Sequence, residues 1–171
     1  YITALDEAAK TSKYGQAEDL LKDLKKFQRV AGEKVVPSES KVNLEVSYNK
    51  MGIFKNTYRS YLMLGLVLLI IFFVRIFKKV TDTSDRVFKW LGRIVSFLIV
   101  FMFVYHGIGL GFRWYISGHE PWSNGYEAVI FISWVTTLPG IIFSRKNPVI
   151  LAGTAILASM MIFVTEMNLL D

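Results

Sequence analysis

The chain has 171 residues, of which 53% are hydrophobic, and its mean hydropathy of +0.38 argues against an ordinary soluble domain. The absence of cysteine excludes disulfides, thiolate metal sites and Cys-x-x-Cys redox pairs. The formal net charge of +6 is spread over separate segments without a dense basic patch, so nucleic-acid binding is not expected. We therefore expect a membrane protein with a soluble part. Because the chain begins with Tyr1 and ends at Asp171 just after an apolar run, we expect it to belong to a longer polypeptide.

Residues 1–59 form a polar N-terminal region. Within it, apolar residues recur at helical spacing and Gly32 follows them, which predicts an amphipathic helix that ends near this glycine. Residues 42–48 alternate between apolar and polar, as in a strand, whereas Ser38 after Pro37 can cap a helix. Of these two alternatives we favour the helix. The apolar positions of the amphipathic helix are Ala17, Leu20, Leu21, Leu24 and Phe27.

Four apolar runs follow this region. Each run, with its flanks, approaches the roughly 20 helical residues that cross about 30 Å of hydrocarbon. Because lipid offers no partner for unpaired backbone groups, helices are expected. The sequence predicts an all-α membrane protein with one transmembrane helix in residues 60–77 and three in a membrane domain covering 91–171. The runs themselves are 61–74, 94–112, 128–143 and 148–165.

The loops between the runs predict the orientation. The connector 113–127 has only Arg113 as a basic residue, whereas the other two loops are rich in lysine and arginine. Because basic loops stay in the cytoplasm, residues 1–59 and the connector 113–127 are expected to be extracytoplasmic. The basic residues of the two other loops are Arg75, Lys78, Lys79, Arg86, Lys89, Arg93, Arg145 and Lys146.

Several residues mark the ends of the predicted membrane helices. Asn124 with Glu127 three residues later has the pattern of a capping box that begins the third helix. Asn147 followed by Pro148 begins the fourth helix in a similar way. Pro139 should kink or weaken the third helix near its cytoplasmic end.

His106 is the main candidate for chemistry, because ionisable residues inside a membrane are rare and commonly functional. It is suited to ligate haem iron, although a hydrogen bond to a neighbouring helix is an equally simple role. Arg113 lies two helical turns, about 10.5 Å, further along the same face, where it can bind a carboxylate or extend to the membrane interface. Gly107 and Gly111 form a Gly-x-x-x-Gly pair that allows close helix packing.

Aromatic residues surround the connector 113–127. They form either an interfacial aromatic belt or a surface against which a planar ligand can lie. His119 in the same connector is expected to be exposed and is the weaker candidate for a ligand. The aromatic residues are Trp114, Tyr115, Trp122, Tyr126 and Trp134.

The stretch "RWYISGHEPWSNGYEAVIFISW", residues 113–134, closely resembles the external segment near the start of the CcsA part of system II cytochrome c synthases, the CcsA/CcsBA family. The similarity extends more loosely over 91–171. The preceding segment, which includes "VVPSESKVNLEVSYNKMGIFKNTYRSYLMLG", resembles the end of the outer domain and the following membrane helix of fused versions. The matching elements are Arg113-Trp114, Ser117-Gly118-His119, Pro121, Ser123-Asn124, Tyr126-Glu127 and Trp134.

The resemblance implies a multi-pass protein of the bacterial inner membrane that conducts haem b to the outer face. There the haem would be attached to the two thiols of an apocytochrome c with a Cys-x-x-Cys-His motif. It also implies that the remainder of a CcsBA-like polypeptide, with a tryptophan-rich WWD segment, follows beyond Asp171. We therefore expect haem lyase activity from the longer chain, and none from these residues alone.

For individual residues, the resemblance implies that Arg113, Trp114 and Trp122 line or support the haem area. His106 is a possible iron ligand, and no catalytic residue is identified. Asn124 and Glu127 are expected to set the geometry of the connector. The alternatives are a structural or assembly subunit of the membrane that does not bind haem, and a fragment of a transporter for another small molecule.

Overall fold

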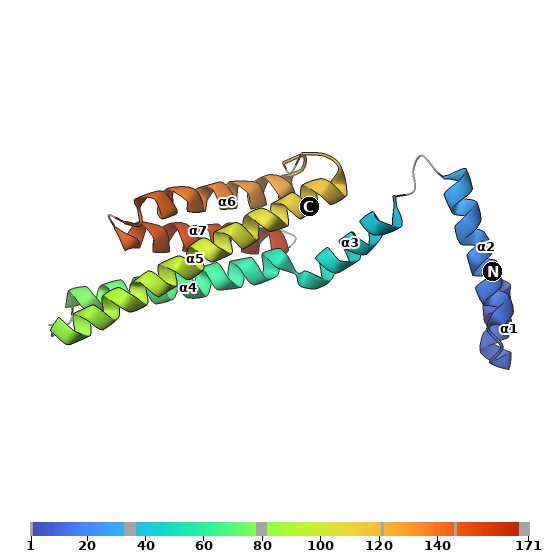
Figure 1. Ribbon diagram of the computed structural model, residues 1–171, viewed down its shortest axis with the longest axis horizontal. Helices are drawn as coiled ribbons and strands as arrows, with labels where there is room; N and C mark the ends of the chain where they lie inside the picture. The colour runs from blue at the N-terminus through green and yellow to red at the C-terminus, as the bar shows by residue number, and fades with distance from the viewer. Residues whose placement is uncertain (1, 33–36, 78–81, 121, 146, 168–171) are drawn as a thin grey trace. The chain divides into compact units, whose positions relative to one another are not determined.

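The computed structural model describes residues 2–32, 37–77, 82–120, 122–145 and 147–167. Over these residues the chain is helical and contains no strand, which confirms the all-α prediction. It divides into two units, Tyr1–Asn43 and Leu44–Asp171, each of which is considered by itself. The helices are α1 Ile2–Thr11, α2 Gly15–Ala31, α3 Glu39–Met51, α4 Ile53–Phe77, α5 Asp82–Ser117, α6 Gly125–Phe143 and α7 Pro148–Glu166 (Figure 1).

The first unit contains the predicted amphipathic helix as α2. Gly32 follows the helix, as expected, and its backbone N–H donates to the Gln28 carbonyl at 2.9 Å. The sequence did not predict α1, which packs against α2 with Ala8 and Ala17 buried. The apolar face of α2 is otherwise largely open within this unit, because Phe27 is 69% exposed.

The ambiguous segment after Pro37 is the helix α3, so the alternative of a strand is wrong. Ser38 decides it locally, because its Oγ accepts the backbone N–H of Lys41 at 3.4 Å in the manner of an N-cap. Gly52 then separates α3 from α4 with φ of +53°, a conformation that glycine adopts without steric cost. Together α3 and α4 form one helical range, Glu39–Phe77, that contains an apolar segment long enough to span a membrane.

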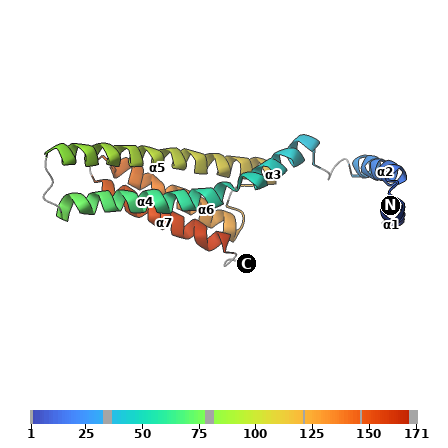
Figure 2. The same cartoon turned by 90° about the horizontal axis from the view of Figure 1, so that it is seen from below.

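The second unit is a bundle in which α4 to α7 lie side by side (Figures 1 and 2). Its helices are long and apolar enough for four membrane spans, as the sequence predicted. Helix α4 contains the expected segment 60–77 and itself starts earlier, at Ile53. Ile53, Phe54 and Thr57 are buried in the bundle, so this extra part of α4 belongs to the packed core.

Helix α7 packs against both α4 and α6. It carries small residues on these faces, namely Ala152, Ala155, Ala158 and Ser159, all of which are buried. A methyl group on Gly65 of α4 would lie 2.8 Å from Cγ1 of Ile156, and one on Gly140 of α6 would collide with Thr154. The Ser159 hydroxyl also donates to the Tyr58 carbonyl of α4 at 2.8 Å. Close helix approach with small residues therefore holds this side of the bundle together.

The ends of α4 and α6 and the starts of α5 and α7 lie at the same end of the bundle (Figure 2). The basic loops on which the predicted orientation rests thus share one side, although Lys78, Lys79 and Lys146 lie outside the described residues. The cap of α7 forms as predicted, because Asn147 Oδ1 accepts the backbone N–H of Val149 at 3.0 Å. Pro139 lies inside α6.

Candidate functional site

The connector between α5 and α6 is a short polar turn at the opposite end of the bundle from the basic loops. Helix α5 ends at Ser117, and Gly118 follows with φ of +76°, which allows the chain to reverse. The Ser117 hydroxyl donates to the His119 carbonyl at 3.2 Å, and the Ser123 hydroxyl donates to the Glu120 carbonyl at 2.8 Å. These bonds stabilise the turn before α6 begins. Pro121, which belongs to the family resemblance, lies outside the described residues.

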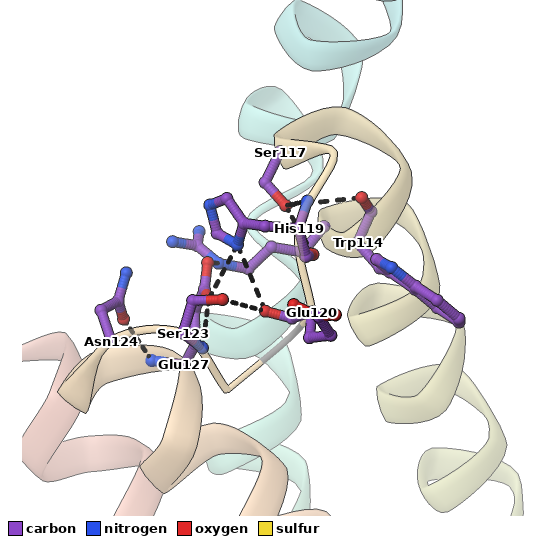
Figure 3. A network of polar contacts seen from close by, with 8 residues as sticks. Trp114, Ser117, His119, Glu120, Ser123, Asn124 and Glu127 are labelled. Atoms are coloured by element: carbon purple, nitrogen blue, oxygen red, sulfur yellow. Dashed lines mark hydrogen bonds and ion pairs between the residues drawn. The ribbon is translucent and has the colours of Figure 1, made fainter.

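Glu127 is the centre of this connector (Figure 3). The residue is only 1% exposed, and Oε1 accepts Nε of Arg113 at 2.9 Å. Its other oxygen, Oε2, accepts the backbone N–H of Ser123 at 3.2 Å and lies 3.7 Å from Nδ1 of His119. One buried carboxylate thus joins the end of α5, the turn and the first turn of α6.

The capping box at the start of α6 forms in a modified way. Asn124 Oδ1 accepts the backbone N–H of Glu127 at 2.8 Å, as the sequence predicted. In the reciprocal bond, the Glu127 carboxylate accepts the backbone N–H of Ser123, one residue before the cap, instead of that of Asn124. The expected role of Asn124 and Glu127 in setting the connector geometry therefore has a direct basis in these contacts.

Arg113 interacts with groups of the protein itself. Besides its bond to Glu127, its guanidinium lies 4.8 Å from the ring centroid of Tyr126. About a third of the side chain, 29%, remains exposed. The positive charge that was expected to attract a carboxylate ligand is thus already balanced by a buried carboxylate, and its first effect is to fix the connector.

His106 is fully buried in the bundle, 0% exposed. Its ring lies 5.7 Å from that of Phe54, edge to face, and 6.0 Å from that of Tyr61. Among the described residues, neither ring nitrogen nor the Tyr61 hydroxyl makes a hydrogen bond of normal geometry, although the backbone of Ile130 interacts with the imidazole and Thr137 interacts with the Tyr61 hydroxyl. A buried imidazole without a well-formed hydrogen bond costs stability, which is unusual for a purely structural residue.

Of the predicted Gly107 and Gly111 pair, only Gly107 makes a close contact with another helix. A methyl group on Gly107 would lie 3.2 Å from Nε1 of Trp134, so the absence of a side chain admits this indole. A methyl group on Gly111 would meet no described atom within 4 Å. Sequence reasoning missed Gly109, where a methyl group would lie 2.7 Å from Cγ2 of Ile53. The close approach of α4 to α5 depends on this glycine.

The tryptophans of this region fall into two groups. Trp134 is half-buried where α6 packs on α5; it stacks on Phe103 at 4.8 Å between ring centroids and donates from Nε1 to the Phe103 carbonyl at 3.0 Å. Its expected place in an outer belt or aromatic surface is thus corrected to a packing role. Trp114 and Trp122 are 57% and 54% exposed, and Trp122 also tilts against Phe131 at 5.2 Å. These two indoles, with the exposed ring of Tyr115, are the aromatic surface that the connector end presents.

A pocket of about 290 Å³ opens beside the connector, with Arg113 and Tyr126 in its wall. Tyr48 and Glu166 also line it, and Phe54 forms part of its lining on the side of α4. The Phe54 ring also contacts His106, so this side chain touches both the pocket and the buried imidazole.

Among the described residues there is no group of three or more His, Asp or Glu side chains that would hold a metal ion on its own. The site offers a buried imidazole, exposed indole faces and a rigid polar turn. These features suit the binding of a flat apolar molecule better than acid–base chemistry.

No protein-family model matches the chain. It is 32% identical to protein NrfI of Wolinella succinogenes over 167 residues, 96% of the chain and 18% of that protein. It is 32% identical to the cytochrome c biogenesis protein CcsA of Prochlorococcus marinus over 101 residues, and 37% identical to the CcsA of Solanum lycopersicum over 100 residues. These two matches cover 57% and 56% of the chain, and 32% and 28% of the respective relatives. The chain thus spans less than a third of the length of each of these proteins, and its sequence is similar to CcsA-type cytochrome c biogenesis proteins over more than half of its own length.

Proposed function

We propose that this chain is part of a membrane protein that conducts haem b to the outer face of the bacterial inner membrane. There the haem is attached to an apocytochrome c with a Cys-x-x-Cys-His motif. The observation that carries the proposal is the similarity to NrfI over 96% of the chain, joined to the CcsA matches. Haem is the substrate in this scheme, and the complete haem lyase includes the remainder of a CcsBA-like polypeptide.

In this proposal, the connector supports the haem on the outer face. Trp114 and Trp122 expose apolar aromatic faces, against which a planar macrocycle can lie. The Arg113–Glu127 pair keeps the turn rigid, so that these indoles keep their positions when haem arrives. Haem propionates would meet the exposed part of Arg113 rather than a free guanidinium.

We propose His106 as an iron ligand that becomes available when Phe54 moves. Neither nitrogen of the imidazole makes a hydrogen bond of normal geometry, and iron ligation by one of them would satisfy the ring in part. Phe54 and Tyr61 pack against the imidazole and fill space that a haem plane would need. These side chains must therefore move before haem can bind His106. His119 is the competing ligand, because it is 47% exposed on the outer connector.

The test is haem absorbance of the purified full-length polypeptide that contains these residues. We expect a Soret band that His106→Ala weakens or shifts and that His119→Ala leaves unchanged. Tyr61→Phe is the matched control, because it removes only a hydroxyl from the wall of the same aromatic pocket. If the purified protein takes up no haem, the alternative of a structural subunit replaces this proposal. If only His119→Ala alters the band, His106 is a packing residue.

The proposed orientation has residues 1–59 and 113–127 outside. Reporter fusions after Lys79 and after Arg145 should both give cytoplasmic signals, because basic loops are retained inside. A reporter in the connector should give an extracytoplasmic signal. An external signal from either basic loop would overturn the orientation and, with it, the assignment of the connector to the face where haem is attached.

A further inference from the structure

A second pocket, of about 390 Å³, lies at the end of the bundle remote from the connector. It forms where α4 and α6 end and α5 and α7 begin, the end at which Figure 2 shows these four helix termini together. Four basic side chains line it, Arg75, Lys89, Arg93 and Arg145. Its other walls are mainly apolar and aromatic. The site therefore combines positive charge with an apolar surface.

The positive charge of this pocket is only partly neutralised. Asp85 binds Arg75 through Oδ1 at 3.0 Å and Lys89 through Oδ2 at 2.6 Å. Arg93 and Arg145 are exposed, and neither makes an ion pair with any residue that the structure describes. Four cations against one carboxylate leave an excess of three positive charges. Two guanidiniums from separate segments are thus available to an external anion.

The start of α7 adds to this field. Pro148, the first residue of this 19-residue helix, lines the pocket, and a helix N-terminus carries a partial positive charge. Phe72 of α4 and Phe88 of α5 form the adjoining apolar wall, each of them partly exposed. A ligand that contacts both the basic side chains and the apolar wall of the pocket has an anionic head and an apolar tail.

We propose that this pocket binds the headgroup phosphate of an anionic phospholipid, with an acyl chain along the apolar wall. Arg93 and Arg145 bind the phosphate, and Phe72 and Phe88 contact the chain. Among the described lining residues there is no histidine or methionine, so an iron-bearing ligand such as haem would find no axial ligand here. In the proposed orientation the pocket lies in the cytoplasmic leaflet, where anionic lipids are concentrated. The proposal does not depend on haem handling.

The experiment uses the full-length polypeptide in a neutral detergent, with bound lipids counted by native mass spectrometry. Phosphatidylglycerol should be retained at lower concentration than phosphatidylcholine with the same acyl chains. Arg93→Gln with Arg145→Gln should weaken phosphatidylglycerol binding by roughly 30-fold, since two charges that contact the headgroup are lost. Arg93→Lys with Arg145→Lys should retain most of the binding, because the charges remain.

Arg59→Gln is the control for the loss of one arginine charge, because Arg59 occupies an exposed position of α4 that does not line this pocket. It should leave phosphatidylglycerol binding unchanged. Equal retention of the two lipids by the unaltered protein would overturn the proposal without any variant. Displacement of the lipid by excess inorganic phosphate would assign the site to a soluble anion, and competitive displacement by haem would assign it to haem. Either result would show that a lipid is not the preferred occupant and would overturn the proposal.

Discussion

Glu127→Ala should destabilise the protein more than any other single change in the connector. The carboxylate is 1% exposed and accepts two hydrogen bonds, from Arg113 Nε at 2.9 Å and from the Ser123 N–H at 3.2 Å. At an effective dielectric constant of about 20, the attraction between the two charges is roughly 6 kcal/mol before the desolvation of the carboxylate is subtracted. The net loss is therefore smaller than this attraction.

Breaking a buried pair by removing one partner costs about 3–5 kcal/mol. Arg113 keeps 29% of its side-chain surface in solvent, and water there compensates part of the loss, so we expect about 3 kcal/mol for Glu127→Ala. Glu127→Gln keeps the shape and one acceptor oxygen but loses the charge, and should cost about half as much. Glu120→Gln is the control, because Glu120 is exposed and only its backbone carbonyl accepts bonds in the turn.

The assay is reversible unfolding of the full-length polypeptide in mixed detergent micelles, combined with a double-mutant cycle. The cycle uses Arg113→Ala, Glu127→Ala and both together. Because the two side chains are direct partners, the double variant should lose clearly less than the sum of the single losses. Additive losses, or a Glu127→Ala variant as stable as Glu120→Gln, would show that the buried carboxylate does not hold the connector.

Three further changes test other parts of the bundle. Asn124→Ala should lower the unfolding free energy by about 1 kcal/mol through loss of the α6 cap, and unchanged stability would deny the cap a role. Gly140→Val should separate α6 from α7 and lower the unfolding free energy by about 1–3 kcal/mol or more. Gly153→Ala should be tolerated, because the added methyl group meets no described atom within 4 Å. Similar accumulation of the two variants would contradict close packing at Gly140. Trp134→Phe should keep the stacking on Phe103 but lose the indole bond at 3.0 Å, costing about 1 kcal/mol in the same unfolding assay, and a fully stable variant would contradict that bond.

The sequence predicted the features that depend on local chemistry. Apolar length gave the four spans, and Asn124 and Asn147 marked the starts of α6 and α7, because a cap is formed by residues close together in the chain. Ser38 likewise favoured the helix over the strand in α3. The start of α4 at Ile53 was missed, because the polar residues of its first turns lower the hydropathy of a segment that is nonetheless packed in the bundle.

Partners between distant helices were not predictable in the same way. A Gly-x-x-x-Gly pattern shows that an approach is allowed, but not which helix makes it, and here Gly107 admits Trp134 while Gly111 faces open space. Trp134 resembles the connector tryptophans in the sequence, yet its indole reaches a carbonyl of α5. The role of Glu127 as a centre required the position of Arg113 on another helix. These pairings depend on tertiary geometry, which a single sequence does not contain.

The buried carboxylate also bears on the proposed attachment of haem. A thioether forms only when the macrocycle is held in a defined orientation, and a displacement of about 1 Å can cost on the order of 100-fold in rate. Among the described residues Glu127 is the only buried carboxylate, and a charge is retained in such a place at a cost in desolvation. This cost is useful if the turn must be rigid. Trp114 follows Arg113 in the chain and Trp122 precedes Ser123, and the Glu127 carboxylate binds both Arg113 and Ser123. Fixing Glu127 therefore fixes the backbone from which each exposed indole projects.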